Sequence, residues 1–178
     1  MKRRQLSQRG FSLLEMAIVI GIIALIIGGI WLAYAAVTSN KREADANGQV
    51  LTIAHNMRNL YVNQNGGDGA SMANLIAAGI FPGNMVSGTT VTNPWNGTVT
   101  ITVPNGGTTF TIIYNGVPEK SCIELVSTNA FEPTEVGMTL MQVGSATVTL
   151  PASPVAADTA CASGVTGNSL RWTFTLRG

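Results

Sequence analysis

The feature that most constrains this chain is an uncharged, mostly apolar run of 22 residues from Met16 to Val37. A helix rises about 1.5 Å per residue, so this run is about 33 Å long and can cross a bilayer. Glu15 is the only charged residue between Phe11 and Val37. A carboxylate at the edge of such a run is costly and usually functional. We therefore expect a membrane-spanning helix whose acidic residue has a role.

The charges of the chain are unevenly placed. Lys2, Arg3, Arg4 and Arg9 stand in the first ten residues, which contain no acidic residue. Without these four, six basic and nine acidic residues remain, a formal net charge of −3. The basic end is expected on the cytoplasmic side of the membrane. The body has no basic patch, and we expect no nucleic-acid partner.

The overall composition excludes several classes of protein. Hydrophobic residues make up 46% of the chain and charged residues only 11%, which excludes a disordered chain. A single apolar segment excludes a polytopic membrane protein. His55 is the only histidine, and we expect it to be a packing or surface residue rather than a metal ligand. With no catalytic pair or phosphate loop in the sequence, we expect neither an enzyme nor a cofactor.

The helix is expected to continue beyond the membrane, from Phe11 to the Asn65-Gly66-Gly67 stretch, over roughly 80 Å. Apolar residues in its second half recur at steps of three and four, which predicts an amphipathic stripe. The stripe consists of Val50, Ile53, Ala54, Met57, Leu60 and Tyr61. The charged residues of this half are expected to face outward or toward neighbours. They are Lys41, Arg42, Glu43, Asp45 and Arg58.

The remaining sequence predicts a short helix and an antiparallel sheet. Ser71 can cap a helix over 72–78 that Gly79 ends. Alternating residues predict four strands. They are expected at 98–103, 108–114, 146–150 and 168–176, with a turn at 104–107 and with Asn115-Gly116 ending the second strand. The predicted fold class is α+β, with a long N-terminal helix packed on an antiparallel sheet as an α/β roll.

Three interpretations of the N-terminal segment compete. A secretory signal peptide needs a small-residue cleavage site, which Ala33-Tyr34-Ala35 provides poorly. A plain membrane anchor leaves Glu15 unexplained. The third interpretation rests on residues 9–15, whose sequence is Arg-Gly-Phe-Ser-Leu-Leu-Glu. This stretch closely resembles the class III signal of type IV prepilins, and it accounts for the glycine, the phenylalanine and the glutamate together.

The resemblance implies how this segment is processed. A membrane peptidase would cut between Gly10 and Phe11, and the new amine of Phe11 would be N-methylated from S-adenosylmethionine. The apolar helix would be retained. Glu15 would then be buried in a filament, where an unpaired carboxylate costs several kcal/mol. The implied partner of Glu15 is the Phe11 amine of a neighbouring subunit, which would set the register of assembly.

The resemblance also divides the chain into segments. Residues 1–10 would be the leader and 11–37 the transmembrane and filament-core helix. Residues 38–178 would be a globular head, with 38–65 as the amphipathic half of the helix. Because the head would be exported, a disulfide between Cys122 and Cys161 is expected. It would enclose a surface-exposed D-region, 122–161.

The body is most similar to type IVb major pilins of enteric bacteria and conjugative plasmids. The Asn93-Pro94-Trp95-Asn96-Gly97 stretch before a hairpin and the 116–122 segment carry this resemblance. The short leader and Phe11 as first mature residue are more typical of type IVa. The resemblance implies a self-assembling pilus subunit, held in the inner membrane of a Gram-negative cell as a precursor and then extracellular. Its other partners would be prepilin peptidase and the pilus assembly machinery.

Several alternatives stay open at this point. A pseudopilin of type II secretion, a minor pilin and a membrane-anchored monomeric binding protein share parts of the pattern. As a pilus subunit, the protein would serve adhesion, aggregation, conjugative contact or motility. Gly21, Gly28 and Gly29 fit local unwinding of the helix and close helix packing equally well. Asn96-Gly97-Thr98 matches an N-glycosylation sequon, and we interpret it as a turn.

Overall fold

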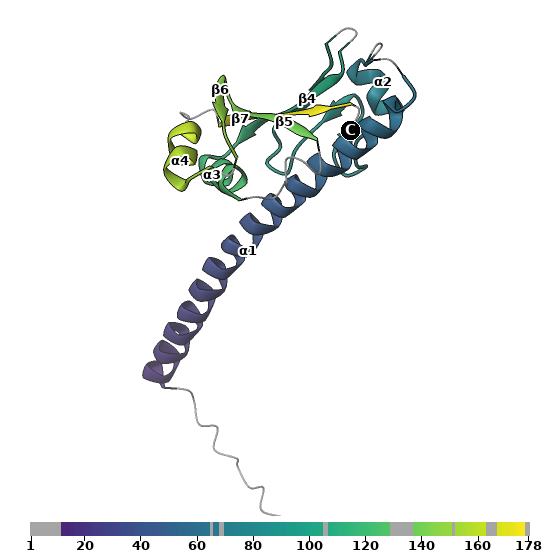
Figure 1. Ribbon diagram of the computed structural model, residues 1–178. Coiled ribbons are helices and arrows are strands. Elements are labelled where there is room, and N and C mark those ends of the chain that lie inside the picture. The colour runs from purple at the N-terminus through teal and green to yellow at the C-terminus, as the bar shows by residue number, and fades with distance from the viewer. Residues whose placement is uncertain are drawn as a thin grey trace, which may run out of the picture. The chain divides into compact units, whose positions relative to one another are not determined.

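The computed structural model describes residues 12–64, 66–67, 70–104, 107–128, 137–150, 152–162 and 167–176. The chain divides into two compact units, Met1–Ser39 and Asn40–Gly178. Helix α1, Leu13–Tyr61, belongs to both (Figure 1). The proposed leader and Phe11 lie outside the described residues.

The second unit contains the core, and its part of α1 contributes an apolar face to it. The expected stripe is confirmed at five of its six positions, because Val50, Ile53, Ala54, Met57 and Tyr61 are buried. Leu60 is the exception, with 37% of its surface exposed, and Ala46 extends the stripe by one turn toward the N-terminus. The helix ends at Tyr61 and not at the expected Asn65. Tyr61 is the last residue that packs inward, so further turns would bury nothing.

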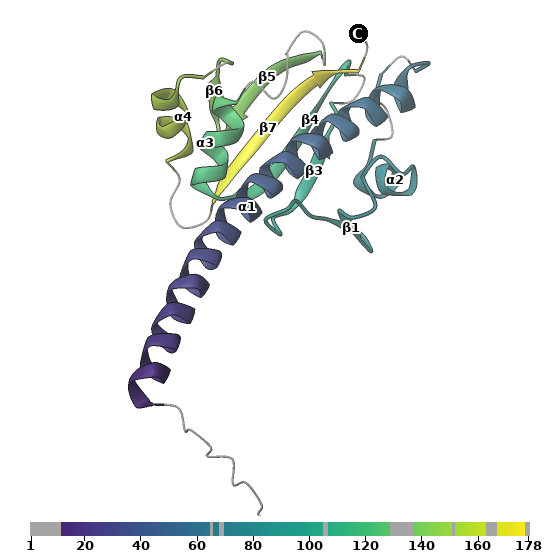
Figure 2. The same ribbon diagram turned by 90° about the horizontal axis from the view of Figure 1, so that it is seen from below.

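A five-stranded antiparallel sheet forms the other layer of this unit, with strand order β3-β4-β7-β5-β6. Its strands are β3 (Val99–Thr102), β4 (Thr109–Val117), β5 (Met138–Val143), β6 (Ala146–Val148) and β7 (Asn168–Thr175). Figure 2 shows the second half of α1 lying along the face of this sheet. The expected α+β architecture of a helix packed on an antiparallel sheet is therefore confirmed.

Aromatic residues of β4 and β7 fill the space at the centre of the sheet. Phe110 and Phe174 stack with ring centroids 5.4 Å apart, and Tyr114 meets Trp172 edge to face at 5.3 Å. All four side chains are at most 1% exposed. Such pairs stabilise a core beyond the apolar area that they bury.

The four expected strands correspond to β3, β4, β6 and β7, with ends that differ from the expected ones by up to three residues. Strand β4 does not stop at Asn115-Gly116 but continues to Val117, which pairs with Asn168 of β7. The register shifts between Tyr114 and Val117, and Gly116 has φ +70°. Glycine accepts this conformation without strain, so the strand bulges and resumes its pairing.

Helix α2, Met72–Ala77, confirms the expected short helix. The Ser71 side chain accepts a hydrogen bond from the Asn74 amide at 3.2 Å, as an N-cap does. Gly79 follows the helix at φ +71°. Two short strands, β1 (Val86–Ser87) and β2 (Thr90–Val91), pair after it.

The described part of the D-region is more buried than expected. It contains most of α3 (Glu119–Ser127) and all of β5, β6 and α4 (Pro154–Cys161), and Figure 1 shows α3 and α4 side by side. Its buried side chains include Leu125, Val126, Met141 and Val143. The expectation of a surface-exposed region was therefore wrong for these residues, because they complete the core beside β7.

Candidate assembly helix and disulfide-bonded region

The N-terminus of α1 is capped by Ser12. The Ser12 hydroxyl accepts a hydrogen bond from the Leu14 amide at 3.3 Å, and its carbonyl accepts one from the Met16 amide at 3.2 Å. Glu15 stands three residues after the cap, in the first turn. This Ser-x-x-Glu spacing is that of a capping box, and a carboxylate there also interacts favourably with the helix dipole. The same spacing is visible in the sequence, and it indicates a capping position for Glu15 beside the role in assembly that the prepilin resemblance implies.

Every large apolar side chain from Leu13 to Val37 is exposed within its unit, between 44% at Val19 and 91% at Leu13. Helix α1 contains an 18-residue stretch of mean hydropathy 2.7 with none of its residues buried. It is the one helix among the described residues that is long and apolar enough to cross a membrane. An apolar surface of this extent needs lipid or other protein chains to cover it.

The helix remains continuous through the three glycines of its apolar half. Gly21, Gly28 and Gly29 are all α-helical, and a Cβ added at any of them would meet nothing within 4 Å. These positions therefore leave room for a neighbouring chain to approach the backbone closely.

Cys122 and Cys161 form a disulfide, with their Cα atoms 5.8 Å apart. Cys122 lies in α3 and Cys161 ends α4, so the bond joins two packed helices. Both cysteines are fully buried. The expected pairing is thus present in the structure, and it closes a long loop of the head.

Two charged residues of α1 do not face outward as expected. Glu43 is only 8% exposed, and its carboxylate accepts a hydrogen bond from the Ser121 hydroxyl of α3 at 3.0 Å. Arg58 is half-buried, and its Nε donates to the carbonyl of Thr175 at 3.2 Å. Both contacts join residues far apart in the sequence, so helical periodicity alone could not reveal them.

A buried polar contact also links the sheet to α1. The Tyr114 hydroxyl donates to Oε1 of Gln49 at 3.3 Å. Burial raises the pKa of the Tyr114 phenol above its ordinary value, because the phenolate would be desolvated. Tyr114 is therefore neutral at all physiological pH values, and its role is structural.

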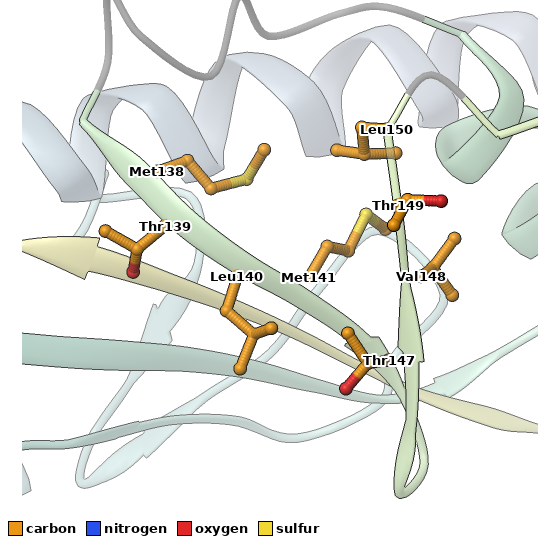
Figure 3. A pocket seen from close by; sticks show the side chains of 8 residues that line it. All are labelled: Met138, Thr139, Leu140, Met141, Thr147, Val148, Thr149 and Leu150. Atoms are coloured by element: carbon orange, nitrogen blue, oxygen red, sulfur yellow. The ribbon is translucent and has the colours of Figure 1, made fainter.

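A hollow of about 270 Å³ lies between β5 and the segment around β6. Figure 3 shows the side chains of Met138 and Leu150 extending toward one another from its two sides. The hollow is lined by apolar residues and threonines: Met138, Thr139, Leu140, Met141, Thr147, Val148, Thr149 and Leu150. None of these side chains titrates in the physiological range, so the hollow supplies no acid–base group.

His55 is an exposed residue, in line with the expectation. Its Nδ1 lies 3.2 Å from Nδ2 of Asn59, one helical turn further on. Among the described residues, no three His, Cys, Asp or Glu side chains are grouped so that they could hold a metal ion.

The comparisons with known proteins agree with this geometry. The prokaryotic N-terminal methylation motif matches residues 6–31, and the family model described as PilS N terminal matches residues 39–175. The chain is 23% identical over 126 residues to the major structural subunit of the bundle-forming pilus from Escherichia coli O127:H6 (strain E2348/69 / EPEC). The subunit of the same description from Escherichia coli O111:H- matches equally well. The match covers 68% of this chain and 65% of these relatives, so the chain spans about two thirds of their length.

The fold has a counterpart among solved structures. The crystal structure of a type IVb pilin from Salmonella typhi matches with a TM-score of 0.52 and 21% sequence identity. The likeness covers 75% of this chain and 98% of that pilin. At this level of identity it shows a shared fold.

The N-terminal motif, the relatives and the fold together define a type IV pilin of the IVb-like class. The chain belongs to the PilS family, whose model covers most of its length.

Proposed function

We propose that this protein is the major structural subunit of an extracellular type IV pilus and that it polymerises through α1. The observation that carries the proposal is the exposed apolar surface from Leu13 to Val37. Lipid would cover this surface in the inner-membrane precursor, and the helices of neighbouring subunits would cover it in the filament. The relatives described as major subunits of the bundle-forming pilus support this assignment.

Processing would precede assembly. Prepilin peptidase would remove residues 1–10 and methylate the new amine of Phe11, and the N-terminal methylation motif over residues 6–31 supports this step. The new positive charge would then pair with Glu15 of a neighbouring subunit inside the filament. Before cleavage this nitrogen is an uncharged amide, so the uncut precursor would lack the partner of Glu15. Cleavage would thereby make the subunit competent for assembly.

The globular head would form the outer surface of the filament. The Cys122–Cys161 bond and the packing of α3 on α4 support this, because they fix the D-region covalently in an oxidising environment. Adhesion, aggregation, conjugative contact or motility would depend on this surface and on the assembly machinery.

Mass spectrometry of material sheared from cells tests the proposal. An N-methylated chain that begins at Phe11, found as the dominant protein of a high-molecular-weight extracellular fraction, is the expected result. A processed chain at trace amounts within fibres of another subunit would indicate a minor pilin. A processed chain that stays in the cell envelope would indicate a pseudopilin. A chain that begins at Met1 and stays in the membrane fraction would contradict polymerisation and favour an anchored binding protein.

A further inference from the structure

The sequence contains Asn-Gly pairs at five places. They are Asn47-Gly48, Asn65-Gly66, Asn96-Gly97, Asn105-Gly106 and Asn115-Gly116. In a flexible chain such a pair undergoes intramolecular deamidation. The glycine nitrogen forms a bond to the side-chain amide carbon of asparagine, ammonia leaves with the displaced proton, and water opens the cyclic imide to aspartate or isoaspartate. The only co-reactant is water.

We propose that Asn96 is a latent deamidation site and that the side chain of Asn93 protects it. Asn96 is exposed to solvent and stands at φ +63°, the one described non-glycine residue with positive φ. It lies in a tight turn, where its amide donates to the Asn93 carbonyl at 3.0 Å. Water therefore reaches this pair, and exposure alone gives it no protection.

The protection comes from the hydrogen bonds of Gly97. Its amide, the nucleophile of the reaction, donates to Oδ1 of Asn93 at 2.9 Å. Its carbonyl accepts from the Asn93 amide at 2.9 Å. Ring closure requires the Gly97 nitrogen to lose its proton and turn toward the Asn96 side chain. Both hydrogen bonds oppose that movement.

Asn93 is itself held in place. It is only 4% exposed, its Oδ1 also accepts from the Trp95 amide at 3.0 Å, and its Nδ2 donates to the Asn115 carbonyl at 2.8 Å. A Cβ added to Gly97 would lie 1.7 Å from that same carbonyl. Gly97 is therefore fixed by the loop on one side and by β4 on the other, and it must remain glycine.

Two other Asn-Gly pairs lie among the described residues, and the first of them serves as the internal reference. Asn47-Gly48 lies within α1. Asn115 belongs to β4, and its amide and its Nδ2 donate to the carbonyl and the hydroxyl of Thr98 at 3.0 and 3.1 Å. The hydrogen bonds of the Asn93 side chain reach Trp95, Gly97 and Asn115. Loss of that side chain should therefore act on Asn96 and leave Asn47 unaffected, whereas the Asn115-Gly116 peptide loses a bond to its carbonyl.

Modification would alter the hairpin that follows. Isoaspartate adds one carbon to the main chain between Asn93 and Thr98, beside the bridge between Thr92 and Thr98. Either product also places a new carboxylate on this surface. The inference rests on the loop geometry and stands independently of the proposed filament function.

The test compares the wild-type full chain with Asn93→Ala in detergent micelles at mildly alkaline pH. Fragment-ion mass spectrometry measures deamidation at Asn47, Asn96 and Asn115 over time. We expect Asn93→Ala to accelerate deamidation at Asn96 by about fivefold or more, because the hydrogen bond from the Gly97 amide to Oδ1 of Asn93 is lost. The rate at Asn47 should stay unchanged. Thr98→Ala, which spares Gly97's hydrogen bonds, should leave the rate at Asn96 unchanged.

Hydrogen exchange gives a second measurement. The Gly97 amide should exchange slowly in the wild type and rapidly in Asn93→Ala. The proposal is overturned if folded wild-type protein deamidates at Asn96 as fast as the reduced, denatured chain. It is equally overturned if Asn93→Ala accelerates deamidation at Asn47 as much as at Asn96, because the protection would then come from the whole fold. Fast exchange of Gly97 in the wild type would also contradict it.

Discussion

The Ser121 hydroxyl donates a hydrogen bond of 3.0 Å to the carboxylate of Glu43, across 78 positions of sequence. Both residues are buried, with 3% and 8% of their surfaces exposed. Ser121 precedes Cys122 in α3, so the bond holds the disulfide-bonded region against α1. A carboxylate in this setting needs its donors, because a buried charge without them carries a large desolvation cost.

Ser121→Ala should lower the free energy of unfolding by about 1–3 kcal/mol, the cost of leaving a buried acceptor short of a donor. Ser127→Ala is the matched control. Ser127 lies in the same helix, and its hydroxyl donates to the Ile123 carbonyl of its own helix at 2.6 Å. Denaturant unfolding of both variants measures the difference. Equal stability of the two variants would show that the contact with Glu43 does not stabilise the head.

Tyr114→Phe should lower the free energy of unfolding by about 1–3 kcal/mol near neutral pH, because Gln49 would lose its buried hydrogen-bond donor. Tyr34→Phe is the control, since Tyr34 is 67% exposed. Unfolding of the two variants by denaturant at neutral pH makes the comparison.

The same substitution should change how stability depends on pH. Burial raises the pKa of folded Tyr114, whereas tyrosine in the unfolded chain ionises near its ordinary value of about 10. The stabilisation of the neutral phenol is therefore complete below about pH 10 and is lost as the pH rises above it. The difference in free energy of unfolding between wild type and Tyr114→Phe should therefore become smaller as the pH rises above about 10. A difference that widens with rising pH would contradict the buried, neutral assignment.

The strictly periodic parts of the fold could be predicted from the sequence. The stripe of α1 and the alternation in β7 gave the right elements, because each packs one regular face against the core. Strand β5 was missed for a physical reason. Its register shifts between Met138 and Leu140, so its buried residues Met138, Met141 and Val143 do not alternate. A bulge breaks the period of two that identifies a strand.

The two shortest strands and the long-range polar contacts could not be predicted either. Strands β1 and β2 are two residues each, too short to show a period. The burial of Glu43 depends on Ser121. The position of the Asn93 side chain similarly depends on its hydrogen bond to the carbonyl of Asn115. At the N-terminus, the pilin motif with Glu15 could be identified from the sequence, while cleavage at Gly10 and methylation of Phe11 stay predictions.

Reduction of the Cys122–Cys161 bond should destabilise the head by about 4 kcal/mol, because a cross-link between residues 39 apart restricts the unfolded chain strongly. Cys122→Ser and Cys161→Ser should each lower the melting temperature by a similar amount. Thermal unfolding with and without reductant measures the effect. The two variants serve as controls, since reductant should not change the melting temperature of either. An unchanged melting temperature of the reduced wild type would contradict a stabilising role of the bond.

Two roles are proposed for Glu15, and substitution can separate them. As the third residue after Ser12 it suits the capping box, and as a charge it would pair with the Phe11 amine of a neighbouring subunit. Glu15→Gln retains the capping geometry and removes the charge, whereas Glu15→Ala removes both. Both variants should be cleaved normally and yield more than about tenfold fewer fibres, because loss of one partner of a buried ion pair costs about 3–5 kcal/mol.

Sheared-fibre yield and the N-terminal peptide together test this separation. Glu119→Gln is the matched control, because Glu119 is an exposed acidic residue in the first turn of α3. The Glu119→Gln variant should give the wild-type yield of fibres. If Glu15→Gln assembles normally and Glu15→Ala does not, the residue acts through helix capping and the charge pairing is wrong. If both assemble normally, Glu15 does not set the register of the filament. Only a loss in both, with cleavage intact, agrees with pairing between subunits.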